Sequence, residues 1–522
     1  MGIKIQQNKR YGRMQRLNRK FLEEEYDSAK KEGIFCYGNK KFNHALTFFE
    51  FAAQIAWSYP ILPDFCDDEL ETYLDDIANT CFKTIYSEKK TRRIVFYNGQ
   101  ILDFGALTEQ YLDYFIDNDF EVLFIVPNKK NTKSGQNILK KIDAAEKVHL
   151  FIPSAKKPLE KIRQIREQIS AFNPEKAFLH FLPNDVTGFC SFASMQQIER
   201  FYIVHNDHTF WLGKKCSDFF IEFRGFGIAV ATEKRKISKD KIFYLPFYPI
   251  KSQIPFQGFP FDRSHKIIAV SGANLYKYLL DKELRYFHII KELLYENENL
   301  IFCLCGKGYG NIINNFITEN KLQERFYYLG QRSDFSQLVS NCDILFESYP
   351  SKGGLTPLFA IETGIPVLGI ANFDNASGSL EDFLGIPDYK QPCTFKEFKE
   401  QATLLINSAE KRKSLEAVQQ NNFFKKRYFT KGLTSIIKKM NNKKELPILA
   451  LTINMEYYLN EYLNLPFANI ATFQLKKLEA LCKVINIKRR LKLFISSVMD
   501  GEKHKSLLLK GLENVLRIKV LH

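Results

Sequence analysis

Short apolar runs alternate with helical patterns along most of this chain, and they do so in two separate series. The first series starts near residue 92, and its apolar runs are 94–97, 122–126, 148–152, 177–182 and 201–204. Patterns of helical period, such as 107–116 and 159–169, separate most of these runs. A repeated strand–helix–strand order predicts a parallel sheet that helices cover on both faces. We therefore expect a Rossmann-like α/β domain over residues 92–250.

A second series of the same kind starts at Lys266. Its apolar runs are 267–270, 300–304, 326–329, 343–346 and 367–370. A stretch with several prolines and glycines, 245–262, precedes it and is typical of a linker. We expect a second Rossmann-like domain over residues 264–440. Two such domains in tandem bind ligands at the carboxyl ends of their strands, here across a cleft between them.

Helical additions are expected at both ends of the chain, over residues 1–91 and 441–522. The stretch 42–55 carries aromatic and alanine residues at helical spacing, which is typical of a packing face. In the basic C-terminal region, 488–494 combines lysines and arginines with an apolar stripe. This composition fits contact with an anionic membrane surface, and it also fits a solvated helix.

The formal net charge of +16 over 522 residues favours a polyanionic partner, although a lysine-rich surface without such a partner gives the same number. Because no nucleic-acid-binding module is recognisable, we do not expect nucleic acid. The ten cysteines form no Cys-x-x-Cys pair, as expected for thiols in a reducing compartment. No run of 18 apolar residues and no signal-peptide pattern occurs, which predicts a cytoplasmic protein.

A glycine-rich loop at 351–356 is the first candidate binding site. It follows the apolar run 343–346 and opens a short helix that Gly364 and Pro366 end. The adjacent Gly353 and Gly354 let the backbone approach a ligand closely, and the start of a helix supplies amide donors for a phosphate. Such a loop is also found as a simple tight turn.

Lys277 lies in a second loop, which follows the first strand of the second series. Because both loops lie beyond the carboxyl ends of strands in one sheet, we expect Lys277 and the Gly353–Gly354 loop to face the same crevice. A lysine and a helix start that face one point form a clamp for a diphosphate. Fixed positive charge there lowers the barrier to breaking a sugar–phosphate bond.

A loop with two histidines follows the last strand of the first series. His205, Asp207 and His208 crowd together there, next to one of the two tryptophans. Histidine is suited to remove a proton near neutral pH, and a carboxylate beside it stabilises the charged ring. We slightly favour His208 over His205 as the base. One short loop supplies too few ligands for zinc, so we expect no metal site, and a structural histidine pair stays an alternative.

Glycines also follow two other strands. Gly99, Asp103 and Gly105 lie in the first loop of the first series, where they permit a sugar or acceptor to approach the next helix. The spacing is not that of a dinucleotide fingerprint. Lys307 lies in a glycine-rich turn after 300–304 and fits either a contact to a nucleotide or a simple turn.

Two of these segments carry a resemblance to a known family. The segment Asn274-Leu-Tyr-Lys277 resembles the Asn/Gln…Tyr-Lys segment of the O-GlcNAc transferase family. The loop Gly353-Gly-Leu-Thr356, with Gly364-Ile-Pro366, keeps the spacing of that family's Gly-His-Thr-Thr…Ala-Gly-x-Pro loop. Bacterial cytoplasmic N-glycosyltransferases, which share the two-Rossmann (GT-B) arrangement, are similar too.

The resemblance spans about residues 93–370, and its specific part is confined to these two segments. It implies a nucleotide-sugar transferase that uses a UDP-sugar and no other cofactor. By the resemblance, Lys277 and Thr356 hold the diphosphate, Asn274 lines the donor site, and Leu355 lies where the family has threonine.

The sequence departs from the family in more than one respect. The family's ribose-binding carboxylate is replaced by Phe359, and Glu362, one turn later, is the candidate substitute or else a plain helix-end residue. The Glu-x7-Glu pattern of many retaining transferases is also missing. These departures leave the donor sugar and the stereochemistry open.

The resulting prediction is a metal-independent hexosyltransferase of GT-B type. It would transfer a sugar to a glycan, a lipid-linked glycan or a protein. Polysaccharide biosynthesis and protein glycosylation at the inner face of a membrane both fit this reading. A sugar-nucleotide epimerase and a non-catalytic partner subunit of the same fold are the alternatives.

Overall fold

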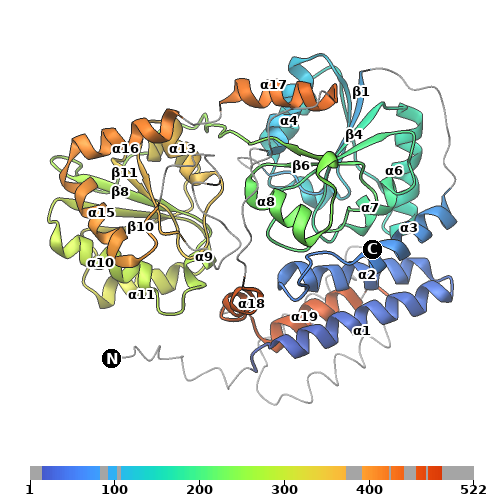
Figure 1. Ribbon diagram of the computed structural model, residues 1–522, viewed down its shortest axis with the longest axis horizontal. Helices are drawn as coiled ribbons and strands as arrows, with labels where there is room; N and C mark the ends of the chain where they lie inside the picture. The colour runs from blue at the N-terminus through green and yellow to red at the C-terminus, as the bar shows by residue number, and fades with distance from the viewer. Residues whose placement is uncertain are drawn as a thin grey trace.

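The first domain is built on a seven-stranded sheet in which every pair of neighbours is parallel (Figure 1). The computed structural model describes residues 15–82, 92–102, 107–371, 382, 391–421, 425–439, 454–465, 468–481 and 483–484. The strand order is β3-β2-β1-β4-β5-β6-β7. The strands are β1 (Arg93–Asn98), β2 (Glu121–Ile125), β3 (Val148–Phe151), β4 (Lys176–His180), β5 (Glu199–Ile203), β6 (Phe219–Glu222) and β7 (Ile242–Tyr244).

The second domain has a five-stranded parallel sheet with the order β10-β9-β8-β11-β12. Its strands are β8 (Ile267–Gly272), β9 (Leu300–Cys305), β10 (Phe326–Gly330), β11 (Ile344–Phe346) and β12 (Val367–Leu368). All ten apolar runs of the sequence lie on strands, which confirms the predicted fold class. The sequence did not predict β6 and β7, which are short and extend the first sheet at one edge.

Helices cover both faces of each sheet because the central strands are apolar on both faces. Along β1, Val95 and Tyr97 belong to one apolar core and Ile94 and Phe96 to the other, following the two-residue period of a strand. The first domain contains α4 (Leu107–Asp117), α5 (Gln136–Ala144), α6 (Pro158–Phe172), α7 (Val186–Phe192) and α8 (Gly225–Ala229). The second contains α9 (Tyr276–Leu279), α10 (Arg285–Glu296), α11 (Gly310–Glu319), α12 (Phe335–Val339), α13 (Thr356–Glu362), α15 (Phe395–Asn407) and α16 (Ala409–Asn421).

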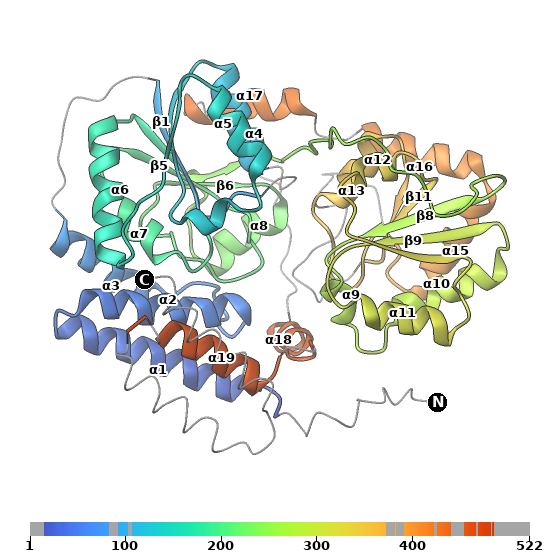
Figure 2. The ribbon, with the colours of Figure 1, turned by 180° about the vertical axis from the view of Figure 1, so that it is seen from behind.

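Helix α17 (Lys426–Ile437) leaves the second domain and packs on the first, as both views of the ribbon show (Figures 1 and 2). The Phe429 ring contacts Tyr111 and Tyr248, and the hydroxyls of Tyr114 and Thr434 are hydrogen-bonded at 2.9 Å. The boundary expected at residue 440 assigns α17 to the second domain. The apolar face of α17 completes the core of the first domain, although the helix follows the second in sequence.

Helices from the N-terminal and C-terminal regions form one helical layer beneath the first domain (Figure 2). Phe473 of α19 (Ile470–Leu481) contacts Phe21 of α1 (Arg19–Gly38) and Phe51 of α2 (Phe42–Ser58). Helix α3 (Asp68–Cys81) joins this layer to α7. Among the described residues, no helix has the length and apolarity to cross a membrane. The basic segment 488–494 lies outside the described residues.

Candidate functional site

A cavity of about 360 Å³ lies between the two domains. The first domain contributes His205, Asp207 and His208, and the second contributes Lys277 and the loop that contains Gly354 and Leu355; all of these line the cavity. The structure thus brings together the two elements that the sequence placed on separate sheets. The reason is topological, since each element follows the carboxyl end of a parallel strand, β5 in the first case and β8 or β11 in the second.

Asp207 is fully buried and holds the histidine loop in place. Its carboxylate accepts two hydrogen bonds from Arg224, at 2.5 and 2.7 Å, and lies 3.2 Å from Nδ1 of His208. Burial opposes ionisation of Asp207, but the Arg224 guanidinium outweighs this effect and holds the pKa of the carboxyl well below its usual range. Asp207 is therefore a fixed negative charge beside the His208 ring, which is partly exposed toward the cavity.

His205 has a different environment from His208. Its ring lies edge-on to His180 at 4.4 Å, and its Nε2 lies 2.7 Å from the side-chain amide of Asn206. Burial, with the nearby His208, lowers the pKa of His205 to about 4. His205 is therefore neutral at pH 7 and a weak base, which favours the choice of His208 made from the sequence.

Lys277 points across the crevice toward the glycine-rich loop. Its ammonium donates a hydrogen bond to the backbone carbonyl of Lys352. Burial lowers the pKa of Lys277 to about 8, against the opposing pull of the Glu347 carboxylate, and the charge of Arg224 adds to the lowering. An anion bound in the cavity would favour the charged form of this lysine.

The Glu347 carboxylate holds the glycine-rich loop in place through hydrogen bonds. Its Oε1 accepts hydrogen bonds from the amide and the hydroxyl of Ser348 and from the amide of Gly353, at 2.9 to 3.0 Å. The Thr356 hydroxyl donates to the carbonyl of Gly272 at 2.9 Å, which ties the loop to the end of β8. Among the described residues, no hydrogen bond occupies the amides of Gly354, Leu355 and Thr356.

The other residues predicted to bind the donor lie around this cavity without lining it. Asn274 and Lys307 are exposed, and the backbones of their loops meet where the amide of Leu275 donates to the Lys307 carbonyl at 3.1 Å. Gly306, with φ at +153°, lies so close to the Ala273 carbonyl that a side chain there would overlap it.

The glycine loop of the first domain is described only in part. Gly99 packs against the backbone of Leu182, so closely that a side chain would overlap it. Asp103 and Gly105 lie outside the described residues. Leu107, the first residue of α4, lines the cavity, which places the end of this loop beside it.

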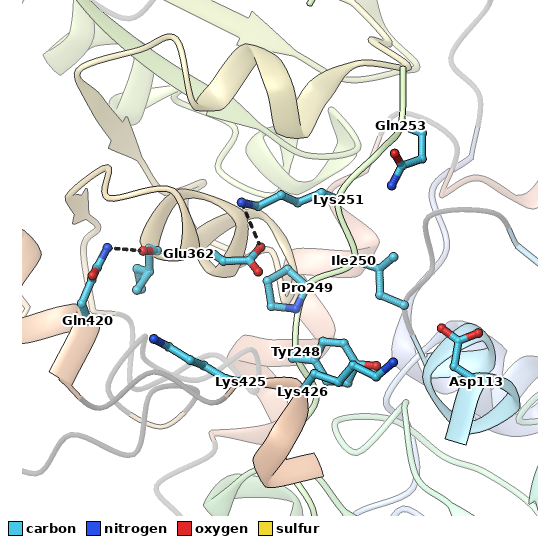
Figure 3. Close-up of a pocket in the computed structure, with 11 residues that line it drawn as sticks. Asp113, Tyr248, Pro249, Ile250, Lys251, Gln253, Glu362, Gln420, Lys425 and Lys426 are labelled. Carbon is cyan, nitrogen blue, oxygen red and sulfur yellow. Dashed lines mark hydrogen bonds and ion pairs between the residues drawn. The ribbon is translucent and has the colours of Figure 1, made fainter. Parts of the chain in front are cut away.

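Glu362 lies in a different cavity, of about 590 Å³, at the opposite end of α13 (Figure 3). Its carboxylate is 3.9 Å from the Lys251 ammonium, and Lys425 also lines this space. Glu362, predicted to join Lys277 in one site, thus lines a cavity that Lys277 does not line. Phe359, one turn earlier, is almost fully buried and contacts Phe335 edge-on at 6.5 Å.

Several residues that line the cavity were not predicted from the sequence, among them Arg224, Tyr276 and Tyr462. Arg224 follows β6, a strand that was not predicted, and it pairs with Asp207. Tyr276 was overlooked beside Lys277, and Tyr462 comes from the distant C-terminal region. The adjacency of Tyr276 to Lys277 was a signal available in the sequence, whereas nothing local to Tyr462 pointed to it.

Within the described part of the chain, no group of three or more His, Cys, Asp or Glu side chains has the geometry to hold a metal ion.

Trp211 beside the histidine loop is buried, where it stacks on Tyr202 at 4.4 Å and on the Arg235 guanidinium at 4.0 Å.

Comparison by sequence finds no matching protein-family model and no matching curated protein. Comparison by structure does find similar proteins. A glycosyltransferase from Rickettsia africae aligns with a TM-score of 0.51 and 14% identity, over 69% of this chain and 100% of that one. TarM from S. aureus, in a crystal structure with fondaparinux, alpha-GlcNAc-glycerol and UDP, aligns with a TM-score of 0.50 and 10% identity, over 67% of this chain and 100% of that one. At these identities the likeness establishes the fold, which is the two-Rossmann GT-B architecture.

Proposed function

We propose that this protein is a glycosyltransferase that moves a hexose from a UDP-sugar to a hydroxyl or amide group of a glycan, a lipid-linked glycan or a protein. One observation carries the proposal: a single cavity between the domains joins the His205–His208 loop to Lys277 and the glycine-rich loop. This pairs a proton acceptor with a cationic anion site, the two functions that sugar transfer from a diphosphate needs.

The departing diphosphate is assigned to the second domain. The Lys277 ammonium and the amides of Gly354 and Leu355 supply positive charge and donors at the cavity wall, and the Thr356 amide follows them at the start of α13. Negative charge grows on the diphosphate as the bond to the sugar breaks, so fixed donors stabilise the transition state more than the ground state.

The proton is assigned to His208. The acceptor group loses its proton to the free nitrogen of the ring, while Nδ1 faces the Asp207 carboxylate at 3.2 Å. Asp207 stabilises the charged ring that results, and Arg224 fixes the orientation of Asp207 through two hydrogen bonds.

Several finer assignments belong to this proposal. UDP as the nucleotide is favoured by the resemblance of the Asn274–Lys277 segment to the O-GlcNAc transferase group, and the TarM structure also contains UDP. Transfer without a metal ion, a cytoplasmic location and contact of the basic tail with a membrane stay predictions. Cell fractionation and titration with EDTA during turnover test them.

The direct experiment incubates the purified chain with a panel of UDP-sugars and follows UDP release together with the fate of the sugar. Slow hydrolysis, or transfer to an added glycan, supports the proposal. Isomerised sugar nucleotides would identify an epimerase instead, and binding of UDP without turnover would identify a non-catalytic subunit.

A further inference from the structure

Helix α18 (Met455–Leu463) returns to the cleft from the C-terminal end of the chain. The Asn454 side chain starts this helix by accepting a hydrogen bond from the Tyr457 amide at 3.1 Å. Tyr458, which is 1% exposed, donates its hydroxyl to the backbone carbonyl of His208 at 3.0 Å. A residue 250 positions away in sequence therefore holds the loop of the assigned base.

The number of hydroxyl protons determines which tyrosine is the donor in the next hydrogen bond. The hydroxyls of Tyr458 and Tyr462 are 3.2 Å apart. Each tyrosine has one hydroxyl proton, and that of Tyr458 goes to the His208 carbonyl. Tyr462 must then be the donor to Tyr458, which leaves lone-pair capacity on the Tyr462 oxygen and no proton to give.

The position of Tyr462 indicates which part of a bound ligand its hydroxyl would contact. Tyr462 lines the cavity together with Tyr276, and burial raises the pKa of Tyr462, so its hydroxyl stays protonated near neutral pH. Tyr276 is the residue directly before Lys277, which is the group assigned to the diphosphate. A sugar attached to that diphosphate would lie in the same cavity as Tyr462.

We propose that α18 forms a wall of the donor site, in which Tyr458 positions His208 and Tyr462 accepts a hydrogen bond from a hydroxyl group of the transferred sugar. This inference rests on the proposed function, because it needs a sugar nucleotide in the cleft. It adds a specificity-determining residue and a positioning residue from a region that the fold alone would assign to packing.

The first test compares the affinities for UDP and for UDP-glucose by titration calorimetry, with UDP-N-acetylglucosamine as a second sugar nucleotide. Tyr462→Phe removes the oxygen and keeps the ring. We expect it to reduce the preference for the sugar nucleotide over UDP by about two- to tenfold, as for the loss of one hydrogen bond, with UDP affinity unchanged. Tyr457→Phe, on the same helix and partly exposed, is the matched control.

An unchanged preference in Tyr462→Phe would overturn the assignment of Tyr462, while UDP binding by the same samples would leave the proposed function standing. If neither UDP nor a UDP-sugar binds the wild-type chain, the proposed function itself fails and this inference fails with it.

The second test follows the His208 side chain directly. The imidazole resonance of His208 is identified in the NMR spectrum of histidine-labelled protein by its loss in His208→Gln. We expect this resonance to shift in Tyr458→Phe and not in Tyr457→Phe, and the turnover number to fall in Tyr458→Phe while UDP affinity stays unchanged. A His208 resonance identical to that of the wild type would refute the positioning role.

Discussion

Replacement of Lys277 by alanine gives the sharpest test of the anion site. The Lys277 ammonium is partly buried at the cavity wall, beside the loop whose amides are the other donors. A hydrogen bond to a charged group contributes about 1.5–3 kcal/mol, so the variant should bind UDP about 10- to 150-fold more weakly. Calorimetric titration with UDP measures the change. Lys282→Ala removes an exposed lysine five residues away and is the control.

The pH dependence of the same titration separates the role of the charge from that of the side-chain volume. Because burial lowers the pKa of Lys277 to about 8, the free enzyme loses this charge as the pH rises through 8. UDP binding requires the charged form, so wild-type affinity should fall by up to tenfold per pH unit above pH 8 and then level off at the affinity of the alanine variant. Lys277→Ala should show no such fall.

Equal UDP affinity of the wild type and Lys277→Ala would refute this reasoning, and so would a parallel pH dependence of the two proteins. Either result would move the diphosphate away from Lys277 and remove the basis for the glycine-rich loop as its partner.

Three further predictions concern the first domain. His208→Ala should lower the turnover number by about 10²- to 10⁴-fold without changing UDP affinity. His149→Ala, which changes an exposed histidine, serves as the control. Near-normal turnover of His208→Ala would show that another residue is the base. Asp207→Ala leaves the buried Arg224 guanidinium without its main partner and should cost about 3–5 kcal/mol of unfolding free energy, and an unchanged melting temperature would contradict this. Burial raises the pKa of Glu222 from 4.5 to about 8, so between these pH values the unfolded chain binds fewer protons at this residue than the folded chain. The free energy of unfolding of the wild type, relative to that of Glu222→Gln, should therefore fall as the pH rises from 5 to 8. A difference that does not depend on pH would show that Glu222 is not protonated in the folded protein.

Local pattern was enough to predict the central strands. Strands β1 and β2 are apolar on both faces, and such runs bounded by turns have few alternatives to a buried parallel strand. Strand β6 was missed because no helix separates it from β5, so the alternation of strands and helices did not mark it. Strand β7 has three residues and lies at the sheet edge, where it pairs with β6 alone.

The site could be predicted where it follows strand ends. His208 and Lys277 meet in one cavity because the carboxyl ends of parallel strands are where such folds bind ligands, and that rule needs only the order of the strands. Helical spacing gives a face but not a position along the helix axis, and Glu362 lines a second cavity because α13 spans the distance between the two.

The sequence by itself determined two parallel α/β domains and the loops that carry their chemistry, because strand periodicity and turn residues act over a few neighbouring positions. Only the tertiary structure decided which distant segments complete the cleft: Arg224 beside Asp207, and Tyr458 and Tyr462 beside His208. These contacts depend on where each helix crosses from one domain to the other. The packing of whole apolar faces determines that course, and no local sequence pattern does.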